Sequence, residues 1–324
     1  MRLTFTDLQS RCQDGSGGDT STASLTFFKQ RLNTRYENVV SALPSWVTQV
    51  TDTFSTADSD DPQQYYYYPP NIRSVESLKI TIGDRDYDLK PVFSYAEWNR
   101  LNAIDIAAGA IPARFFNRRD DFGIYPIPQD EYTATIVYNI RAGGMTKSDY
   151  TTATVTATEN SVTITGAGTA FSTSNNVVAG EWFSLADATT GESRGSWYRI
   201  HSVDSTTAVT LESYFEEGTE AGASYIMGEC PEIPADMHEL LVYGALSDYF
   251  AEKRQDITKA QAWENKYYTG DFNNNNRDRT KVVGGLIKAI EKYEDRNDSA
   301  LVQRRSPARS AQEKVFATTL SDSE

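Results

Sequence analysis

The stretch that decides the fold of the later part of the chain is IPADMHELLVYGALSDYF, residues 233–250. Its apolar residues recur mainly at three- and four-residue steps, which is the spacing of one face of an α-helix. The spacing predicts a helix from Pro234 with an apolar face of Met237, Leu240, Leu241, Gly244, Ala245 and Phe250.

The same period predicts helices on both sides of this stretch. Residues 24–43 carry an apolar stripe that Pro44 ends, and a second helix is expected from about Ile257 to Tyr268. A further helix is expected where apolar residues stand at i, i+3, i+4 and i+7. The members of the first stripe are Leu25, Phe28, Leu32, Tyr36, Val39 and Val40, and those of the last are Val283, Leu286, Ile287 and Ile290.

Between Trp46 and Val92 the apolar period falls to two, which is typical of β-strands. Residues 47–54 form one strand candidate, and residues 74–82 and 85–90 predict a hairpin. In the run Tyr65 to Tyr68, alternate tyrosines should point inward and outward. Ser94 followed by Glu97 is a capping-box pattern that predicts a helix after the hairpin, with further strands between 113 and 141.

The composition changes sharply between Thr151 and Glu229. This segment has 15 Thr, two basic residues and ten acidic ones, so it supplies −8 of the net charge of −14. Its short Thr- and Val-rich segments alternate with Gly, Asn and Asp turns, which predicts a small β-sandwich or barrel.

Composition and charge exclude several classes of function. A net charge of −14 argues against a nucleic-acid reader, which needs clustered Lys and Arg. No apolar run reaches about 18 residues and the first residues lack a signal-peptide pattern, so we expect a chain that neither spans a membrane nor follows the conventional secretory route. Cys12 and Cys230 fit neither a disulfide framework nor a metal-spacing motif.

Side chains that carry catalysis or bind metals are scarce. His201 and His238 are the only histidines, and packing or surface roles are the expected ones. Two acidic clusters could suggest a calcium site or a glycosidase pair, but neither has the required spacing. These are Asp58, Asp60 and Asp61, and Glu216, Glu217 and Glu220. We predict no enzyme activity, catalytic residue, metal or cofactor, with a carboxylate-dependent virion glycosidase as the enzymatic alternative.

Three stretches resemble the head-to-tail adaptor (connector or neck) proteins of tailed bacteriophages. The first is Leu8-Gln9 followed by residues 28–36 (FKQRLNTRY), and the second is residues 68–75 (YPPNIRSV) with the later 124–128 (IYPIP). The third is the helix of residues 233–250, a pattern similar to one in virion neck proteins. Together the similar stretches span about the first 145 residues and 231–269, whereas the segment 148–229 departs from the basic pattern.

The resemblance implies a structural virion protein in the neck, present in the host cytoplasm during assembly. It implies a homo-oligomeric ring of twelve copies that docks under the portal and joins the capsid to tail or nozzle proteins. DNA would pass through the lumen without sequence-specific binding, and an acidic lumen would repel it. No membrane partner is implied, and the inserted segment could anchor tail fibres.

The expected fold class is α+β. A helical adaptor core with antiparallel β-strands comprises residues 1–147 and 230–284, an all-β sandwich or barrel module is inserted at 148–229, and residues 285–324 form an extended C-terminal helix and tail. The tail should reach a neighbouring subunit or the portal. Candidate interface residues are Phe28, Leu32, Tyr36, Met237, Leu241, Tyr249, Leu286, Ile287, Ile290, Arg304 and Arg305.

The main alternative is a tail-associated binding module. In this hypothesis the inserted segment recognises a glycan or anchors a tail fibre, and Trp182, Trp197 and Tyr198 are stacking platforms. The 19 Tyr, 14 Phe and 5 Trp of the chain leave both possibilities open, because aromatic side chains serve interfaces as well as β-sheet cores.

Overall fold

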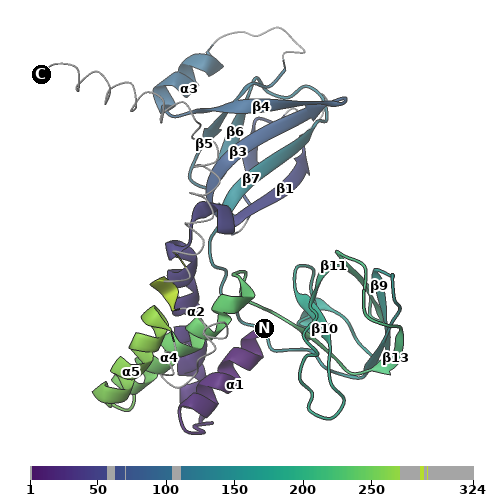
Figure 1. Ribbon diagram of the computed structural model, residues 1–324. Coiled ribbons are helices and arrows are strands. Elements are labelled where there is room, and N and C mark those ends of the chain that lie inside the picture. The colour runs from purple at the N-terminus through teal and green to yellow at the C-terminus, as the bar shows by residue number, and fades with distance from the viewer. Residues whose placement is uncertain are drawn as a thin grey trace, which may run out of the picture. The chain divides into compact units, whose positions relative to one another are not determined.

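The computed structural model describes residues 2–56, 63–69, 71–103, 111–270, 285–287 and 290 (Figure 1). Contacts divide the chain into two compact units. The first combines Met1–Pro44 with Gly144–Glu324, and the second is Ser45–Gly143.

The first unit contains a helical bundle. Its helices are α1 (Phe5–Gly15), α2 (Thr22–Ala42), α4 (His238–Glu252) and α5 (Ile257–Thr269). Helix α4 contacts each of the other three and buries Leu240, Leu241, Ala245 and Leu246 almost completely. The helix predicted from residues 233–250 is confirmed, although its first turn, η3 (Ala235–Met237), is a 3-10 helix.

The rest of the first unit is a curled seven-stranded sheet with the order β13-β8-β9-β12-β11-β10-β14. The edge strands β13 and β14 are separated only by Ser224, so one bent segment forms both edges of the sheet. Buried side chains fill the interior, including Phe183 and Tyr225 from the strands and Phe215 from the loop before β13. The strand bounds are β8 (Thr154–Ala157), β9 (Thr163–Ala167), β10 (Trp182–Leu185), β11 (Tyr198–Ser205), β12 (Ala208–Leu211), β13 (Glu220–Ala223) and β14 (Tyr225–Gly228), with η2 (Thr173–Asn175) between β9 and β10.

The second unit is another curled sheet of seven strands, in the order β1-β7-β3-β4-β5-β6-β2. Its strands pair antiparallel except β4 and β5, which are parallel. The ring of Phe54 on one edge strand lies 5.3 Å from that of Tyr66 on the other, which brings the two edges together. The strands are β1 (Gln49–Ser55), β2 (Tyr65–Tyr67), β3 (Ile72–Ile82), β4 (Arg85–Val92), β5 (Arg114–Asn117), β6 (Asp121–Tyr125) and β7 (Thr133–Ile140), and η1 (Ser45–Val47) precedes them.

Helix α3 (Tyr95–Asn102) packs on the face of this second sheet that points away from the main apolar core of its strands. It does so through Trp98, which is 1% exposed. The predicted helix is therefore confirmed, but Ser94 makes no side-chain capping bond. The predicted hairpin is also confirmed, since Ile82 pairs with Arg85 around the Gly83-Asp84 turn.

The predicted fold class was wrong. The protein is mostly β, with two seven-stranded sheets, 31% helix and 32% strand, rather than a helical core that carries antiparallel strands and one small β insert. The physical reason is pairing: strands β1–β7 bond to one another and share their own apolar core, which includes Ile80, Phe122 and Ile136. They are therefore not layered onto the helices of an α+β core. The predicted C-terminal helix and tail lie almost wholly outside the described residues.

The core of the inserted sheet gives a direct stability prediction. Tyr225 is 2% exposed and its hydroxyl donates to the Thr152 carbonyl, whereas Tyr214 in the same sheet region is 65% exposed. We expect Tyr225→Ala to lower the free energy of unfolding by about 3–5 kcal/mol because it leaves a cavity and an unpaired carbonyl. Tyr214→Ala, the matched control, should change it by less than about 0.5 kcal/mol in urea titrations. Equal losses in the two variants would contradict the placement of Tyr225 in the core.

Candidate functional site

The interface residues predicted on α2, η3 and α4 lie inside the bundle. Phe28, Leu32, Tyr36, Met237, Leu241 and Tyr249 are each at most 3% exposed. The rings of Phe28 and Tyr249 lie 5.0 Å apart, which joins α2 to α4. These side chains therefore hold the chain's own helices together and present almost no surface to a partner.

The remaining predicted interface residues belong to the C-terminal segment. Leu286 is buried, Ile287 is 49% exposed and Ile290 is partly buried. Arg304 and Arg305 lie outside the described residues, as do the acidic cluster of Asp58, Asp60 and Asp61 and the apolar residue Val283.

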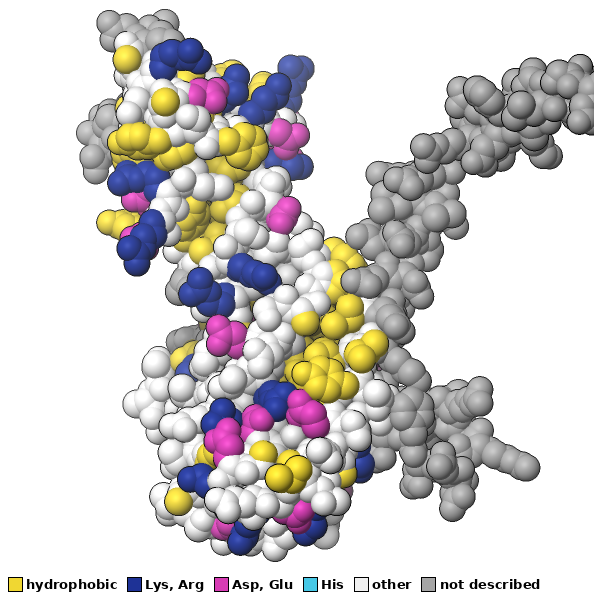
Figure 2. All heavy atoms as spheres, turned by 90° about the vertical axis from the view of Figure 1, so that its left-hand side faces the viewer, with side chains coloured by type: hydrophobic (Ala, Val, Ile, Leu, Met, Phe, Trp, Pro, Cys, Tyr) yellow, Lys and Arg dark blue, Asp and Glu magenta, His cyan; other side chains and the backbone are white. Residues whose placement is uncertain are grey.

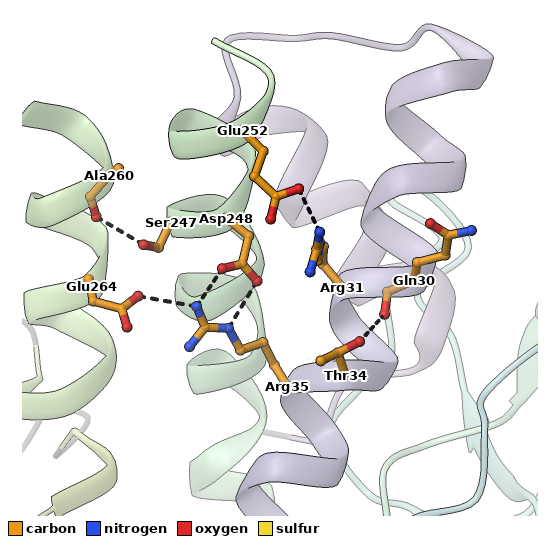
Figure 3. A network of polar contacts seen from close by, with 9 residues as sticks. All are labelled: Gln30, Arg31, Thr34, Arg35, Ser247, Asp248, Glu252, Ala260 and Glu264. Carbon is orange, nitrogen blue, oxygen red and sulfur yellow. Dashed lines mark hydrogen bonds and ion pairs between the residues drawn. The ribbon is translucent and has the colours of Figure 1, made fainter. Parts of the chain in front are cut away.

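A charged network crosses the bundle at Arg35 of α2 (Figure 3). Its guanidinium donates to both carboxylate oxygens of Asp248 on α4, with Nε–Oδ2 3.0 Å and Nη2–Oδ1 2.5 Å, and its Nη2 also donates to Glu264 of α5 at 3.2 Å. Its side chain is only 13% exposed. Burial lowers the pKa of Arg35, but the hydrogen bond and charge of Asp248 outweigh burial and the net shift is upward.

Gly244 makes room for this arginine. A Cβ atom at position 244 would lie 2.8 Å from Cδ of Arg35, closer than real Cβ contacts. The glycine that the sequence places on the apolar face of α4 therefore lets the arginine stem cross the helix and reach Asp248. The centroid of the Tyr267 ring on α5 lies 4.9 Å from the guanidinium carbon of Arg35.

The adjacent pair, Arg31 and Glu252, joins the same two helices at the surface. Its Nη2–Oε2 distance is 2.5 Å, and the two side chains are 33% and 48% exposed (Figure 3). Water competes for such exposed charges, so ion pairs at the rim contribute little to stability.

The two arginines offer a matched test of burial. We expect Arg35→Met to lower the free energy of unfolding by about 3–5 kcal/mol, because it leaves the Asp248 carboxylate without its partner. Arg31→Met should cost less than about 1 kcal/mol. Chemical denaturation of both variants checks this, and a small loss for Arg35→Met would show that Asp248 finds other partners.

His238 lies at the start of α4 with no exposed surface. Its Nδ1 accepts from the Leu3 amide at 2.9 Å, so the proton is on Nε2, which donates to the Ile233 carbonyl at 3.2 Å. Burial lowers its pKa to about 4. The neutral ring thus ties the segment before α1 to the start of α4, a packing role rather than a catalytic one.

A buried carboxyl joins α1 to the segment that leads into the inserted sheet. Oδ2 of Asp149 accepts from the Thr4 hydroxyl at 2.7 Å, while its Oδ1 is buried without a hydrogen-bond partner. Burial raises the pKa of Asp149 to about 7, although the bond from Thr4 opposes the shift. A neutral carboxyl fits this place because a bare charge is costly to bury.

Asp149 should make stability depend on pH. Its folded pKa lies above its unfolded value, so the unfolded chain loses this proton first and stability falls as the pH rises from about 4 to 7. Asp149→Asn removes this titrating group. We therefore expect the free energy of unfolding of the variant to rise relative to that of the parent chain as the pH increases over this range. A pKa difference of about three units, at 1.36 kcal/mol per unit, limits this change in the free energy of unfolding to roughly 4 kcal/mol.

Urea titrations at pH 4 and pH 8 measure this difference. Asp14→Asn, at an exposed position near the end of α1, is the control and should show no comparable dependence. A stability gap between Asp149→Asn and the parent that is the same at both pH values would rule out the titration of Asp149.

The three aromatic residues of the glycan hypothesis do not form an open platform. Tyr198 is 7% exposed and packs on Phe215, with ring centroids 5.2 Å apart. The guanidinium of Arg2 covers the ring of Trp182 at 3.5 Å, and the indole Nε1 of Trp197 is buried. This arrangement does not favour sugar stacking at these residues.

The groups that catalysis or metal binding would use are not gathered. Within the described residues, no cluster of three or more His, Cys, Asp or Glu side chains could hold a metal ion. Both cysteine thiols are buried and free, and burial raises their pKa values. Glu216 and Glu217 lie in the loop between β12 and β13, near the exposed Tyr214, and Glu220 is the first residue of β13.

Several aromatic side chains of the second unit are exposed. Phe93 is 90% exposed, Tyr67 82% and Tyr95 66%. Tyr95 contacts the half-buried Phe116, with ring centroids 6.0 Å apart, and the guanidinium of Arg118 lies 4.6 Å from the ring of Tyr65. We call Tyr67, Phe93, Tyr95, Phe116 and Arg118 the aromatic row.

The exposure of the aromatic row was not predicted from the sequence. The alternation of the tyrosine run is confirmed, because Tyr66 is buried in the sheet core and Tyr67 points outward. Phe93 and Tyr95 flank Ser94, the N-cap residue of α3. No apolar face that could bury these two rings was predicted at this position, and that could have indicated that they are exposed.

Comparisons with known proteins identify no relative. No family model matches the chain, and no curated protein matches it. Among the residues that the structure describes, no helix has both the length and the apolar character needed to cross a membrane.

Proposed function

We propose that this chain is a structural subunit of a tailed-phage virion, a head-to-tail adaptor that works by burying surface against other proteins. The observation that carries the proposal is the exposure of the aromatic row, because exposed Tyr, Phe and Arg side chains are typical of protein interfaces.

The helical bundle supports the same proposal. Helix α4 carries the stretch that most resembles neck proteins, and it is the helix that α1, α2 and α5 all contact. The resemblance therefore concerns the framework of the first unit rather than a peripheral segment. In this proposal, partners bind to exposed surfaces such as the aromatic row, while the buried helix faces fix the subunit's shape.

The proposed partners follow from the resemblance. They are further copies of the chain in a ring, the portal protein on the capsid side, and tail or nozzle proteins on the other side, with tail fibres as a further candidate for the inserted sheet. DNA would pass the ring without sequence-specific contacts, in keeping with the net charge of −14.

Deletion of the gene from the encoding phage tests the proposal. We expect DNA-filled heads without tails in electron micrographs, with tailed particles restored when the chain is supplied in trans. A supplied chain that carries Arg31→Met should restore assembly as well as the parent, because Arg31 is partly exposed and its loss should cost little stability. Tailed, infectious particles in the absence of the chain would refute the adaptor function.

A further inference from the structure

The sheet of the second unit ends at β1 (Figure 1). On the face of this unit that Figure 2 shows, hydrophobic side chains are interspersed with Lys and Arg, so charges interrupt the apolar surface there. Strand β1 differs, because in the part of the chain that the structure describes it pairs with β7 alone. It meets β2, the other edge strand, through the rings of Phe54 and Tyr66 and not through strand pairing. Among the described residues, one side of the β1 backbone is therefore left without a partner strand.

The register shows which backbone groups of β1 point away from β7. The Ile140 amide donates to the Thr48 carbonyl at 2.9 Å. Because hydrogen-bonded pairs alternate in an antiparallel ladder, the even-numbered residues of β1 bond to β7 and the odd-numbered ones direct their amides and carbonyls outward. The Thr53 amide accordingly donates to the neighbouring carboxylate of Asp52, at 2.8 Å. A side chain here takes the place that the carbonyl of a further strand would fill.

The side chains of β1 on the core side follow an apolar, acidic, apolar order. Val50 and Phe54 pack against the sheet core but are only partly buried, and the exposed Asp52 stands between them. The seven residues of β1 pair with β7 without a register shift, so the edge is regular. A strand that binds this edge needs apolar side chains opposite Val50 and Phe54, and an uncharged or basic one opposite Asp52.

The β1 edge of a second copy does not meet these requirements. If two copies of β1 paired antiparallel over the whole range Gln49–Ser55, Asp52 of one copy would lie directly opposite Asp52 of the other. Like charges in directly opposed positions destabilise strand pairing. The edge therefore selects against its own copy.

The end of the given sequence contains a segment with the complementary order. Residues 315–321 (VFATTLS) are the longest uncharged stretch between 291 and 324, and they are rich in residue types that favour strands. An antiparallel alignment with Gln49–Ser55 matches apolar to apolar and hydroxyl to carboxylate. In this alignment Phe316 is opposite Phe54, Thr318 opposite Asp52 and Leu320 opposite Val50.

Charges at the two ends of the edge favour the antiparallel direction. Glu131 precedes β7 and Arg141 follows it, so the exposed Glu131 lies at the end of β1 and the exposed Arg141 at its start. Neither forms an ion pair with another described residue, whereas Glu76 of β3, near the start of β1, already accepts from a side-chain amide of β7. The antiparallel alignment brings Lys314 to the acidic end and Asp322 to the end with Arg141.

We propose that residues 315–321 bind the free edge of β1 in the same chain, as an eighth strand antiparallel to it. The Ala317 carbonyl then accepts from the Thr53 amide, which frees the Asp52 carboxylate to accept from the Thr318 hydroxyl. The 24 residues 291–314 can span up to about 80 Å. A tethered segment has an effective concentration in the millimolar range, so the same chain supplies the strand rather than a second copy. The contact does not depend on the adaptor function.

A pair of cysteines in the full-length chain tests the register. Thr51→Cys and Thr319→Cys place the two thiols in directly opposed positions, where the Cα atoms of a strand pair are about 5.5 Å apart and a disulfide fits. Thr51 is exposed, and the native cysteines are buried. Under mild oxidation we expect most of the monomer to carry a disulfide between positions 51 and 319, identified by mass spectrometry of a tryptic digest.

The matched control combines Thr51→Cys with Thr318→Cys. Its second cysteine lies one residue away and on the other face of the strand, so we expect roughly tenfold less cross-linking. Adding Phe316→Ser and Leu320→Ser to the first pair should reduce the cross-link several-fold, because both apolar contacts with β1 are lost. Adding Val315→Ser instead should leave it unchanged, since residue 315 faces outward in this register.

The source of the strand is tested with two singly substituted chains, Thr51→Cys and Thr319→Cys, mixed at about 10 µM. We expect no appreciable cross-link between them. A cross-link that forms mainly between chains would show that another copy supplies the strand, and it would overturn the proposal. Cross-linking that is equal in the control pair, or that persists with Phe316→Ser and Leu320→Ser, would overturn it as well.

Discussion

The burial of α4 among α1, α2 and α5 is the constraint on which the first unit depends. A helix that is apolar on nearly all sides must be covered on nearly all sides. The one strongly polar crossing, from Arg35 to Asp248, is possible because Gly244 leaves space for the arginine stem. Packing and charge therefore specify the same arrangement of helices, since the ion pair is satisfied only when the apolar faces also meet.

The inserted sheet is attached to this bundle through short polar connections. The Phe5 amide donates to the Glu229 carbonyl at 2.8 Å, the Thr4 hydroxyl donates to Asp149, and His238 joins Leu3 to Ile233. The residues that start α1 are thus bonded to both segments that connect the sheet to the bundle. The protonation states of Asp149 and His238 therefore affect the stability of the attachment between the sheet and the bundle. Their role at this position is structural rather than catalytic.

The functional proposals rest on which aromatic side chains are buried in the chain's own cores and which are exposed. The aromatic side chains of the bundle and of both sheets are largely used within the chain, as Phe28, Trp98 and Phe183 illustrate. Those that remain exposed include Tyr67, Phe93 and Tyr95 of the second unit and Tyr214 and Tyr268 of the first. Protein partners are the binding class that best matches rings and arginines on a firm β-sheet support.

The sequence by itself determined the local elements. The periods predicted α4, α2, the hairpin of β3 and β4 and most strands of the inserted sheet, because periodicity depends only on which neighbouring side chains share a face. It missed β13, whose residues Glu220–Ala223 have little apolar alternation.

Only the tertiary structure decided which strands pair and which aromatic side chains stay outside. The same helical stripe is compatible with a core or an interface, and Phe28 and Tyr249 proved to be core because their faces meet within one chain. Likewise, strands 49–140 pair among themselves, which makes the protein mostly β and overturns the expected α+β core. Pairing and exposure depend on contacts between residues far apart in the sequence, and local spacing does not specify these contacts.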